Sequence, residues 1–339
     1  MVGQSLVSRE PIAGAAGATQ PEATPPGDEV NLSQTTPSRR SLFGPGLALC
    51  AVAALSGCAS LSGPSQVAAL AAYNGQTPIT QIDNATESFM LSQGDECGRI
   101  VSLGEGQPGR GAHLSIHGLG TGPSAMQPLI DKAAAEGQAT STFIYDDMHC
   151  NQARVGSDLA RYLRGWMSQH HGQPMTIETH SLGGRMALTA LGQMAREGTL
   201  PSDVVTLNMI SPPLGGFGFA NICLTMPGPL ARLIPGATPT RDMATWSSGQ
   251  KLLEEVALPA SVHTSIFYGT NDNLIDYTKP AHATIENNLH ATVYYLAGGE
   301  HTTTVPTVAT TPRQHFSRQA LPYEPHQRAP QTDLYQGGQ

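Results

Sequence analysis

The sequence predicts an α/β fold in which helices flank a mostly parallel central sheet. β-prone runs alternate with helical runs from residue 112 to residue 304, the pattern of strands joined by helical crossovers. Glycine, histidine, serine and aspartate directly follow several of these strands, as is typical of parallel sheets that carry a site at the carboxyl ends of their strands. The chain has 339 residues, which is enough for one large domain with a sizeable core.

The first 58 residues have the features of a leader. Residues 1–37 are rich in Ser, Thr, Pro, Gly and Ala and lack apolar periodicity, so we expect them to be disordered or to precede the true start of translation. Ser38–Phe43 is basic, with a twin-arginine pattern, and the apolar run Leu47–Leu55 follows it. That run is shorter than the roughly 18–20 apolar residues of a membrane-spanning helix, so it predicts a secretory signal.

The signal ends in Leu55-Ser56-Gly57-Cys58, which resembles the lipobox of bacterial lipoproteins. The resemblance implies cleavage before Cys58 and attachment of acyl chains such as palmitate, which would anchor the protein to a membrane. A plain signal peptide with an incidental Cys58 is the alternative. Ala59, rather than Asp, favours the outer membrane if the host is Gram-negative. We therefore expect an exported protein of the bacterial cell envelope, with residues 59–83 as a tether.

The folded domain is expected to span residues 84–304. Ser88–Ser92 and Arg99–Leu103 are short β-prone runs around a glycine-bounded turn, which predicts an opening hairpin. Further strands are predicted at 112–116, 142–145, 175–179, 203–210, 262–268 and 292–296, and helices at 125–136, 152–169, directly after Ser181, and at 280–289. Residues 305–339 are rich in Thr, Pro and Gln and are predicted to form a flexible tail.

One junction between strand and helix has the pattern of a nucleophile elbow. The β-prone run Met175–Thr179 meets a run with helical apolar spacing, Leu182–Met194, so Ser181 lies at the sharp turn between them. The segment His180–Gly184 (HSLGG) resembles the elbow of bacterial lipases and other α/β-hydrolases, although Thr179 stands where Gly is usual. The resemblance implies an α/β-hydrolase fold and a nucleophilic Ser181.

A glycine-rich loop after an earlier strand resembles the oxyanion loop of the same family. The strand Ala112–Ile116 ends in His117-Gly118-Leu119-Gly120. The resemblance implies that the backbone N–H of Leu119, together with that of Leu182, forms the oxyanion hole, where bare amides must approach the developing negative charge. The alternative is a glycine-rich phosphate loop, but the sequence contains neither G-x-G-x-x-G nor a P-loop lysine.

Two later turns supply candidates for the remaining members of a catalytic triad. Gly269–Asp272 resembles the family's Gly-x-x-Asp turn, which implies that Asp272 is the acid, with Asp276 as the fallback. His301 lies in the loop after the last predicted strand, where it can act as the general base. The order Ser181, Asp272, His301 is the α/β-hydrolase order.

An uncharged stretch lies between the elbow and the acid. No Asp, Glu, Lys or Arg occurs from residue 204 to residue 231, and several large apolar residues do. Such an insertion at the carboxyl edge of a sheet predicts a lid or acyl pocket over about residues 214–250. An ordinary packed loop is the alternative.

The cluster Asp146–Cys150 contains potential metal ligands. It lacks a second set at zinc-like spacing, so we expect a loop cap and no metal site. Once the leader is removed and Cys58 is lipidated, Cys97, Cys150 and Cys223 remain in an oxidising compartment, which allows one pair and one free thiol. We expect Cys97 to pair with Cys150.

The function predicted from these features is that of a membrane-anchored serine hydrolase of carboxylic esters with apolar acyl groups, such as lipid esters, that requires no cofactor. A net charge of −8 argues against a nucleic-acid partner. An acyltransferase with the same triad, a thioesterase or a peptidase fits the same residues. The alternative from another class is a non-catalytic surface lipoprotein that uses the fold for binding.

Overall fold

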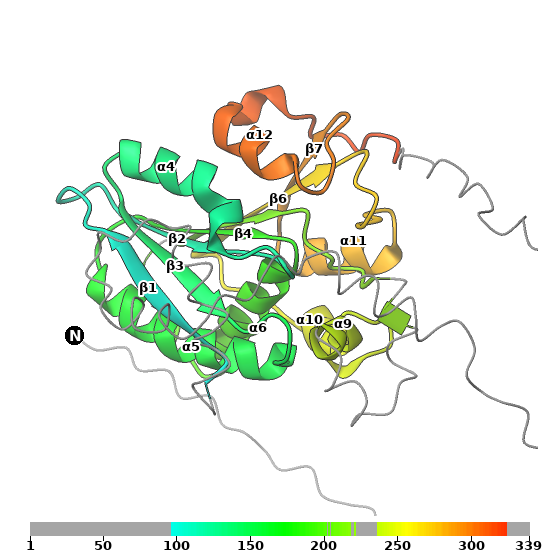
Figure 1. Cartoon of the computed structure of the whole chain (residues 1–339), viewed down its shortest axis with the longest axis horizontal. Helices are drawn as coiled ribbons and strands as arrows, with labels where there is room; N and C mark the ends of the chain where they lie inside the picture. The colour runs from blue at the N-terminus through cyan, green and yellow to red at the C-terminus, as the bar shows by residue number, and fades with distance from the viewer. Residues whose placement is uncertain (1–95, 202, 204, 218–219, 222–235, 324–339) are drawn as a thin grey trace, which may run out of the picture. The chain divides into compact units, whose positions relative to one another are not determined.

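The structure is a computed structural model that describes residues 96–323, apart from 202, 204, 218–219 and 222–235 (grey in Figure 1). The predicted leader, the lipidation site Cys58, the tether, the strand 88–92 and Cys223 lie outside the described residues, so they stay predictions. Within the described part of the chain, no helix combines the length and the apolar character needed to cross a membrane.

A seven-stranded sheet forms the centre of the described domain, in the order β1-β3-β2-β4-β5-β6-β7. β1 pairs antiparallel with β3, and every other pairing is parallel. The strands are β1 (Gly98–Gly104), β2 (Ala112–Ile116), β3 (Ala139–Tyr145), β4 (Met175–His180), β5 (Val205–Ile210), β6 (Val262–Gly269) and β7 (Thr292–Leu296). The mostly parallel sheet expected from the sequence is confirmed.

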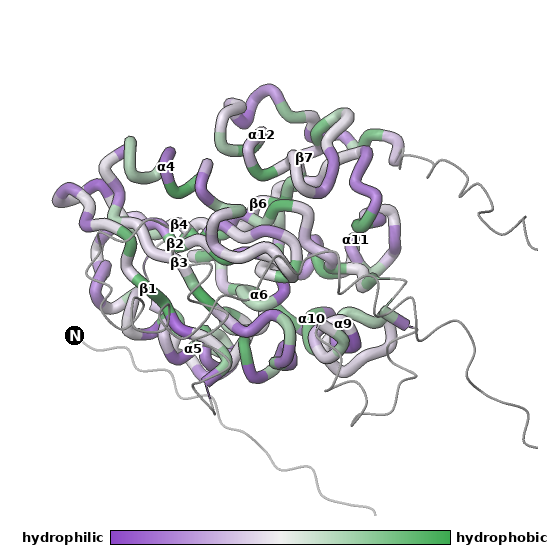
Figure 2. Tube along the Cα trace, viewed as in Figure 1, coloured by the Kyte–Doolittle hydropathy of each residue, from purple (hydrophilic) through white to green (hydrophobic). Residues whose placement is uncertain are grey.

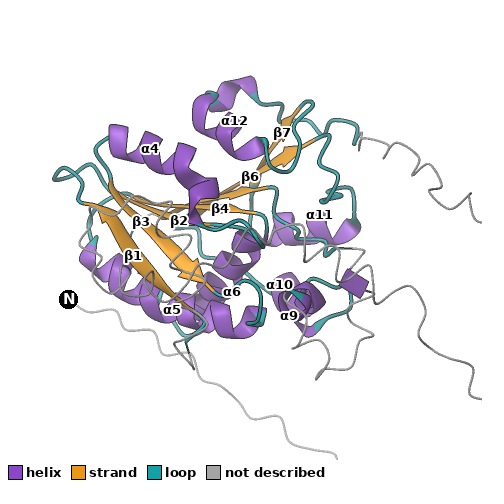
Figure 3. Ribbon diagram, in the orientation of Figure 1, coloured by secondary structure: helices purple, strands orange, loops and turns teal. Residues whose placement is uncertain are grey.

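Helices cover both faces of this sheet (Figures 1 and 3). The helices α5 and α6 pack on each other on one face, and α4 and α12 pack on each other on the opposite face. The helical elements are η1 (Pro123–Met126), α4 (Gln127–Ala135), α5 (Gln152–Gln169), α6 (Leu182–Arg196), α9 (Ala237–Asp242), α10 (Ser248–Glu254), α11 (Pro280–Asn288), α12 (Thr304–Thr310) and η2 (Arg313–His315).

Helix α5 shows why the sequence pattern predicted its bounds correctly. Its buried residues include Val155, Leu159 and Leu163, which recur at helical spacing and face the core. Hydrophilic and hydrophobic stretches alternate along the helix in Figure 2. The side chain of Asn151 caps the first turn by accepting a hydrogen bond from the N–H of Arg154. The helix therefore spans 152–169, as the periodicity indicated.

The first described strand is joined to the rest of the sheet by a disulfide. The predicted run Arg99–Leu103 lies within β1 and pairs with β3. Immediately before this strand, Cys97 forms a disulfide with Cys150, in the loop that follows β3. The predicted cysteine pair is confirmed.

The prediction of a flexible tail from residue 305 is wrong as far as residue 323. Val305 and Val308 of α12 are buried in a core cluster together with residues of η1 and α4. Further along, Arg313 donates a hydrogen bond of 2.8 Å to Asn208 Oδ1, and Phe316 packs edge-on against Phe267. The threonine- and proline-rich composition suggested a tail, but a few apolar side chains are sufficient to dock the segment. Residues 324–339 lie outside the described part.

The described part of the insertion at 214–250 is fixed to helix α6 by a buried arginine. The Arg185 guanidinium is fully buried. It donates to Gln152 Oε1 at 2.9 Å and to Pro213 O, Gln250 Oε1 and Asp242 O at 2.8 Å each. These bonds tie α9 and α10 to the elbow helix. Whether the insertion acts as a lid stays a prediction, because residues 222–235 lie outside the described part.

Candidate active site

Ser181 occupies a strained turn between β4 and α6. Its backbone has φ 51° and ψ −123°, a conformation that L-residues rarely adopt. The Ser181 N–H donates to the carbonyl of Ile210 at 2.9 Å, which fixes the turn against β5. A Cβ on Gly183 would lie 2.4 Å from the carbonyl oxygen of His117, so only glycine allows this close approach. This is the geometry of a nucleophile elbow.

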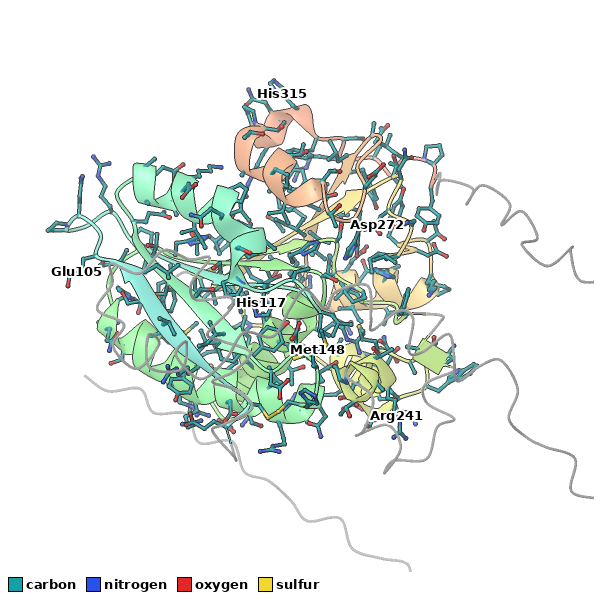
Figure 4. All side chains as sticks on the ribbon, viewed as in Figure 1. Glu105, His117, Met148, Arg241, Asp272 and His315 are labelled. Carbon is teal, nitrogen blue, oxygen red and sulfur yellow. A yellow bond between two sulfur atoms is a disulfide. The ribbon has the colours of Figure 1, made fainter. Side chains whose placement is uncertain are left out.

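The structure brings the three predicted triad side chains together. His301 Nε2 lies 2.9 Å from Ser181 Oγ, and His301 Nδ1 lies 2.8 Å from Asp272 Oδ2. The second carboxylate oxygen of Asp272 accepts hydrogen bonds from the N–H groups of Leu274 and Ile275, each at 2.9 Å. The three side chains come from the carboxyl ends of β4, β6 and β7, which meet at one edge of the sheet. Asp272 is labelled at this edge in Figure 4.

The electrostatics of Asp272 determine which tautomer His301 adopts. Burial alone would raise the pKa of the Asp272 carboxyl, but the hydrogen bond and charge of His301 and two backbone N–H groups outweigh it and hold that pKa below its usual range. The carboxylate therefore stays ionised at neutral pH and accepts the Nδ1–H of His301. The Nε2 lone pair is left to accept the hydroxyl proton of Ser181.

Asp276, the fallback acid, does not take part in this chain of contacts. Its Oδ1 accepts hydrogen bonds from the N–H and the hydroxyl of Thr278, at 3.0 and 2.6 Å. Of the two candidate carboxylates, Asp272 is the one that contacts the imidazole.

The glycine-rich loop after β2 passes directly over Ser181. A Cβ on Gly118 would lie 2.9 Å from Ser181 Cβ, so the loop contacts Ser181 through bare backbone. The backbone N–H groups of Leu119 and Leu182 have no hydrogen-bond acceptor among the described residues. Both predicted oxyanion donors are therefore free to bind a substrate oxygen.

His180, the residue before Ser181, contacts the candidate base His301 and was not singled out from the sequence. Its Nε2–H donates to the carbonyl oxygen of His301 at 3.0 Å, and the two rings lie 4.8 Å apart. Burial, followed by the charge of His301, lowers the pKa of His180 to about 4. His180 is therefore neutral at pH 7 and adds no positive charge that would oppose protonation of His301. Its position next to Ser181 was the available signal.

His117 and Tyr145 hold the start of the glycine-rich loop in place, and neither contact was predicted from the sequence. The two rings stack with centroids 4.4 Å apart, and the Tyr145 hydroxyl donates to the carbonyl of His117 at 2.8 Å. His117 Nδ1–H donates to the carbonyl of Gly118 at 2.9 Å. Burial lowers the pKa of His117 to about 4, so this residue is also neutral at pH 7. His117 is labelled in Figure 4.

The loop Asp146–Cys150 is built as a cap, as expected. Asp146 Oδ1 accepts hydrogen bonds from the N–H groups of Met148 and His149, at 3.1 and 3.0 Å. Within the ranges that the structure describes, no group of three or more His, Cys, Asp or Glu side chains is placed to hold a metal ion.

Comparison with known proteins gives likeness in structure alone. No family model matches the chain, and no curated protein matches its sequence. Monoglyceride lipase from Saccharomyces cerevisiae is 16% identical, with 62% of this chain and 87% of that chain covered at a TM-score of 0.45. A metagenome-derived lipolytic enzyme is 16% identical over 63% of this chain and 91% of its own, at a TM-score of 0.43. A type II thioesterase from the yersiniabactin pathway is 15% identical over 62% and 94%, at a TM-score of 0.42.

At these identities and TM-scores, the likeness adds nothing about substrate or chemistry. The strand order and the positions of the elbow, acid and histidine within it identify the fold independently. The chain has the α/β-hydrolase fold.

Proposed function

We propose that the protein is a serine hydrolase that cleaves carboxylic esters through an acyl-enzyme on Ser181. The observation that carries the proposal is the continuous chain of contacts from Asp272 through His301 to Ser181 Oγ, on a strained elbow. Strain at a position of this kind persists only where the surrounding structure holds it, and it is typical of functional residues.

Each step of the reaction has a group to perform it. Ser181 Oγ attacks the acyl carbon while His301 Nε2 takes its proton, and the N–H groups of Leu119 and Leu182 bind the resulting oxyanion. Collapse of this intermediate expels the alcohol, which receives the proton from His301. A water molecule, deprotonated by His301, then attacks the acyl-enzyme and releases the carboxylic acid and free Ser181.

The acyl group is proposed to be apolar, as in a lipid ester. The support is the uncharged sequence from 204 to 231. It includes β5, which ends beside β4 at the same sheet edge as Ser181. A thioesterase would use the same residues with a thiol leaving group, and an acyltransferase would replace water with an acceptor alcohol.

We also propose that the enzyme is exported and held at a membrane of the cell envelope by acyl chains on Cys58. The support is that a basic segment, an apolar run and a lipobox follow one another in the order expected of a lipoprotein signal. Mass spectrometry of the N-terminal peptide from the native host tests this proposal. An unmodified Cys58, or a mature chain that begins elsewhere, would contradict it.

The experiment that tests the enzymatic proposal is hydrolysis of p-nitrophenyl esters of increasing acyl length, combined with labelling by a fluorophosphonate probe. Ser181→Ala should abolish both labelling and turnover. Ser157→Ala is the matched control, because Ser157 is an exposed serine of α5, and this variant should retain both. The chain-length optimum would separate a short-acyl esterase from a lipase, and added acceptor alcohols would reveal acyl transfer. Turnover that survives Ser181→Ala would refute the mechanism, and a folded protein that is silent towards both reagents would favour a binding role.

A further inference from the structure

We propose that Asp147 is a positioning residue that holds the oxyanion loop, and with it the N–H of Leu119, in its catalytic place. The proposal rests on the proposed function, which gives the loop its task. The observation behind it is a hydrogen bond from the N–H of Gly120 to Asp147 Oδ2. Gly120 directly follows Leu119, so this carboxylate acts one residue away from the oxyanion donor.

The oxyanion loop is held on both sides of Leu119. Before it, Gly118 is fixed by two contacts with Thr121 Oγ1, which accepts from the Gly118 N–H at 3.1 Å and donates to its carbonyl at 3.0 Å. After it, Gly120 has φ +68°, in the left-handed region, and is held by Asp147. Leu119 itself is partly buried against the main core cluster. The direction of its free N–H therefore depends on these two anchored neighbours.

The loop that carries Asp147 is itself firmly anchored. At its start, the N–H of Asp146 donates to the carbonyl of Cys97 at 2.9 Å. At its end, Cys150 is joined to Cys97 by the disulfide. Between these points, the carbonyl of Met148 accepts a hydrogen bond of 2.7 Å from the N–H of Gly236, at the beginning of α9. Asp147 thus connects the oxyanion loop to a segment fixed at three points.

A rigid anchor matters here because oxyanion stabilisation depends on preorganised donors. Removal of one oxyanion donor typically costs about 10²–10³ in kcat, and a displacement of about 1 Å can cost about 10². Loss of the Asp147 anchor would allow Gly120 to move and the N–H of Leu119 to turn away, while Ser181, His301 and Asp272 stay in place. Loss of the anchor should therefore weaken stabilisation of the transition state and leave binding of the substrate in the ground state unchanged.

The test compares Asp147→Ala with Asp147→Asn, which keeps an acceptor oxygen for the Gly120 N–H. We measure kcat and KM on a p-nitrophenyl ester, the affinity of an alkyl trifluoromethyl ketone that forms a tetrahedral adduct with Ser181, and the unfolding temperature. Asp147→Ala should lower kcat by about 10- to 100-fold, leave KM within about threefold, and weaken ketone binding by a factor similar to the loss in kcat. Asp147→Asn should restore most of the kcat. Asp131→Ala, which removes an exposed carboxylate of α4, is the control and should behave like the wild type.

Several outcomes would overturn the proposal. An unchanged kcat in Asp147→Ala would do so, as would a fall in kcat with no loss of ketone affinity. If Asp147→Ala does not fold, Asp147→Glu is the second variant, since it keeps the charge and displaces the carboxylate. A folded Asp147→Glu that retains the full kcat would also contradict the proposal. Failure of the proposed function is distinct, because the wild type would then show no turnover that depends on Ser181.

Discussion

Three buried histidines should make the domain sensitive to mild acid. Burial lowers the pKa of His117 and of His180 to about 4 and that of His282 to about 3. In the unfolded chain, a histidine has a pKa of about 6.5. Below pH 6.5, the unfolded state therefore binds protons that the folded state rejects, and the free energy of unfolding falls as the pH falls.

The size of this effect follows from the same linkage. Between pH 7 and pH 5, each of these histidines should lower the free energy of unfolding by about 2 kcal/mol, or about 6 kcal/mol together. That is a large share of the roughly 5–15 kcal/mol of a typical domain. Burial also raises the pKa of Asp242 and Glu286. These two carboxyls bind extra protons in the folded state and reduce the loss of stability, whereas Asp272 and Glu178, whose pKa values are lowered, add to it. The figure of about 6 kcal/mol is therefore the contribution of the three histidines alone.

Urea unfolding at pH 7, 6 and 5 measures this dependence. His282 is suited to a variant because it lies outside the proposed triad and oxyanion loop and contacts the Tyr268 hydroxyl at 2.8 Å through Nδ1. His282→Gln should reduce the loss between pH 7 and pH 5 by about 2 kcal/mol. His263→Gln is the control, because His263 is exposed, and it should leave the slope unchanged. A free energy of unfolding that is flat from pH 7 to pH 5, or a slope that His282→Gln leaves unaltered, would contradict this role of the buried histidines.

Three further predictions concern single features of the structure. Arg185→Met should lower the free energy of unfolding by about 3–5 kcal/mol in urea titrations, because three buried acceptors and a partly buried one lose their donor. A loss below about 1 kcal/mol would contradict the role of Arg185 as an anchor. Replacing both Cys97 and Cys150 with Ser should cost about 4 kcal/mol, since the disulfide closes a loop with a sequence separation of 53, and an unchanged unfolding temperature would argue against that constraint. Asp272→Asn should reduce kcat by about 10³- to 10⁴-fold while Asp276→Asn stays near the wild type, and the reverse ranking would assign the acid to Asp276.

Much of the fold and of the candidate site was readable from the sequence because the signals are local. The apolar spacing of α5 and the β-prone run of β4 depend on residues within one element, and their predicted ranges agree with the structure. Ser181, Asp272 and His301 each follow a predicted strand, and parallel strands bring their carboxyl ends to one edge. Local pattern and sheet geometry together were therefore sufficient to place these three side chains near one another.

The local sequence pattern did not predict the structure of a segment that is held in place by residues distant in the sequence. Residues 305–323 look like a tail because the apolar residues among their threonines and prolines are few, yet Arg313 and Phe316 find Asn208 and Phe267 on the sheet. The resemblance to the Gly-x-x-Asp turn favoured Asp272 over Asp276, and the structure agrees, because Asp272 Oδ2 contacts His301 whereas Asp276 Oδ1 accepts from Thr278. Such contacts join residues far apart in the chain, and no periodicity records them.

The sequence alone indicated the α/β fold class and the order in which Ser181, Asp272 and His301 follow their strands. It allowed Cys97 and Cys150 as one of the possible cysteine pairs. The contacts that hold these parts in place became visible in the folded structure. It showed the buried Arg185 that ties the insertion to α6, the hydrogen bond from His180 to the carbonyl of His301, and the hydrogen bond from the N–H of Gly120 to Asp147. The physical reason is that a buried polar group must find its partners wherever the chain brings them, and those partners are set by three-dimensional packing.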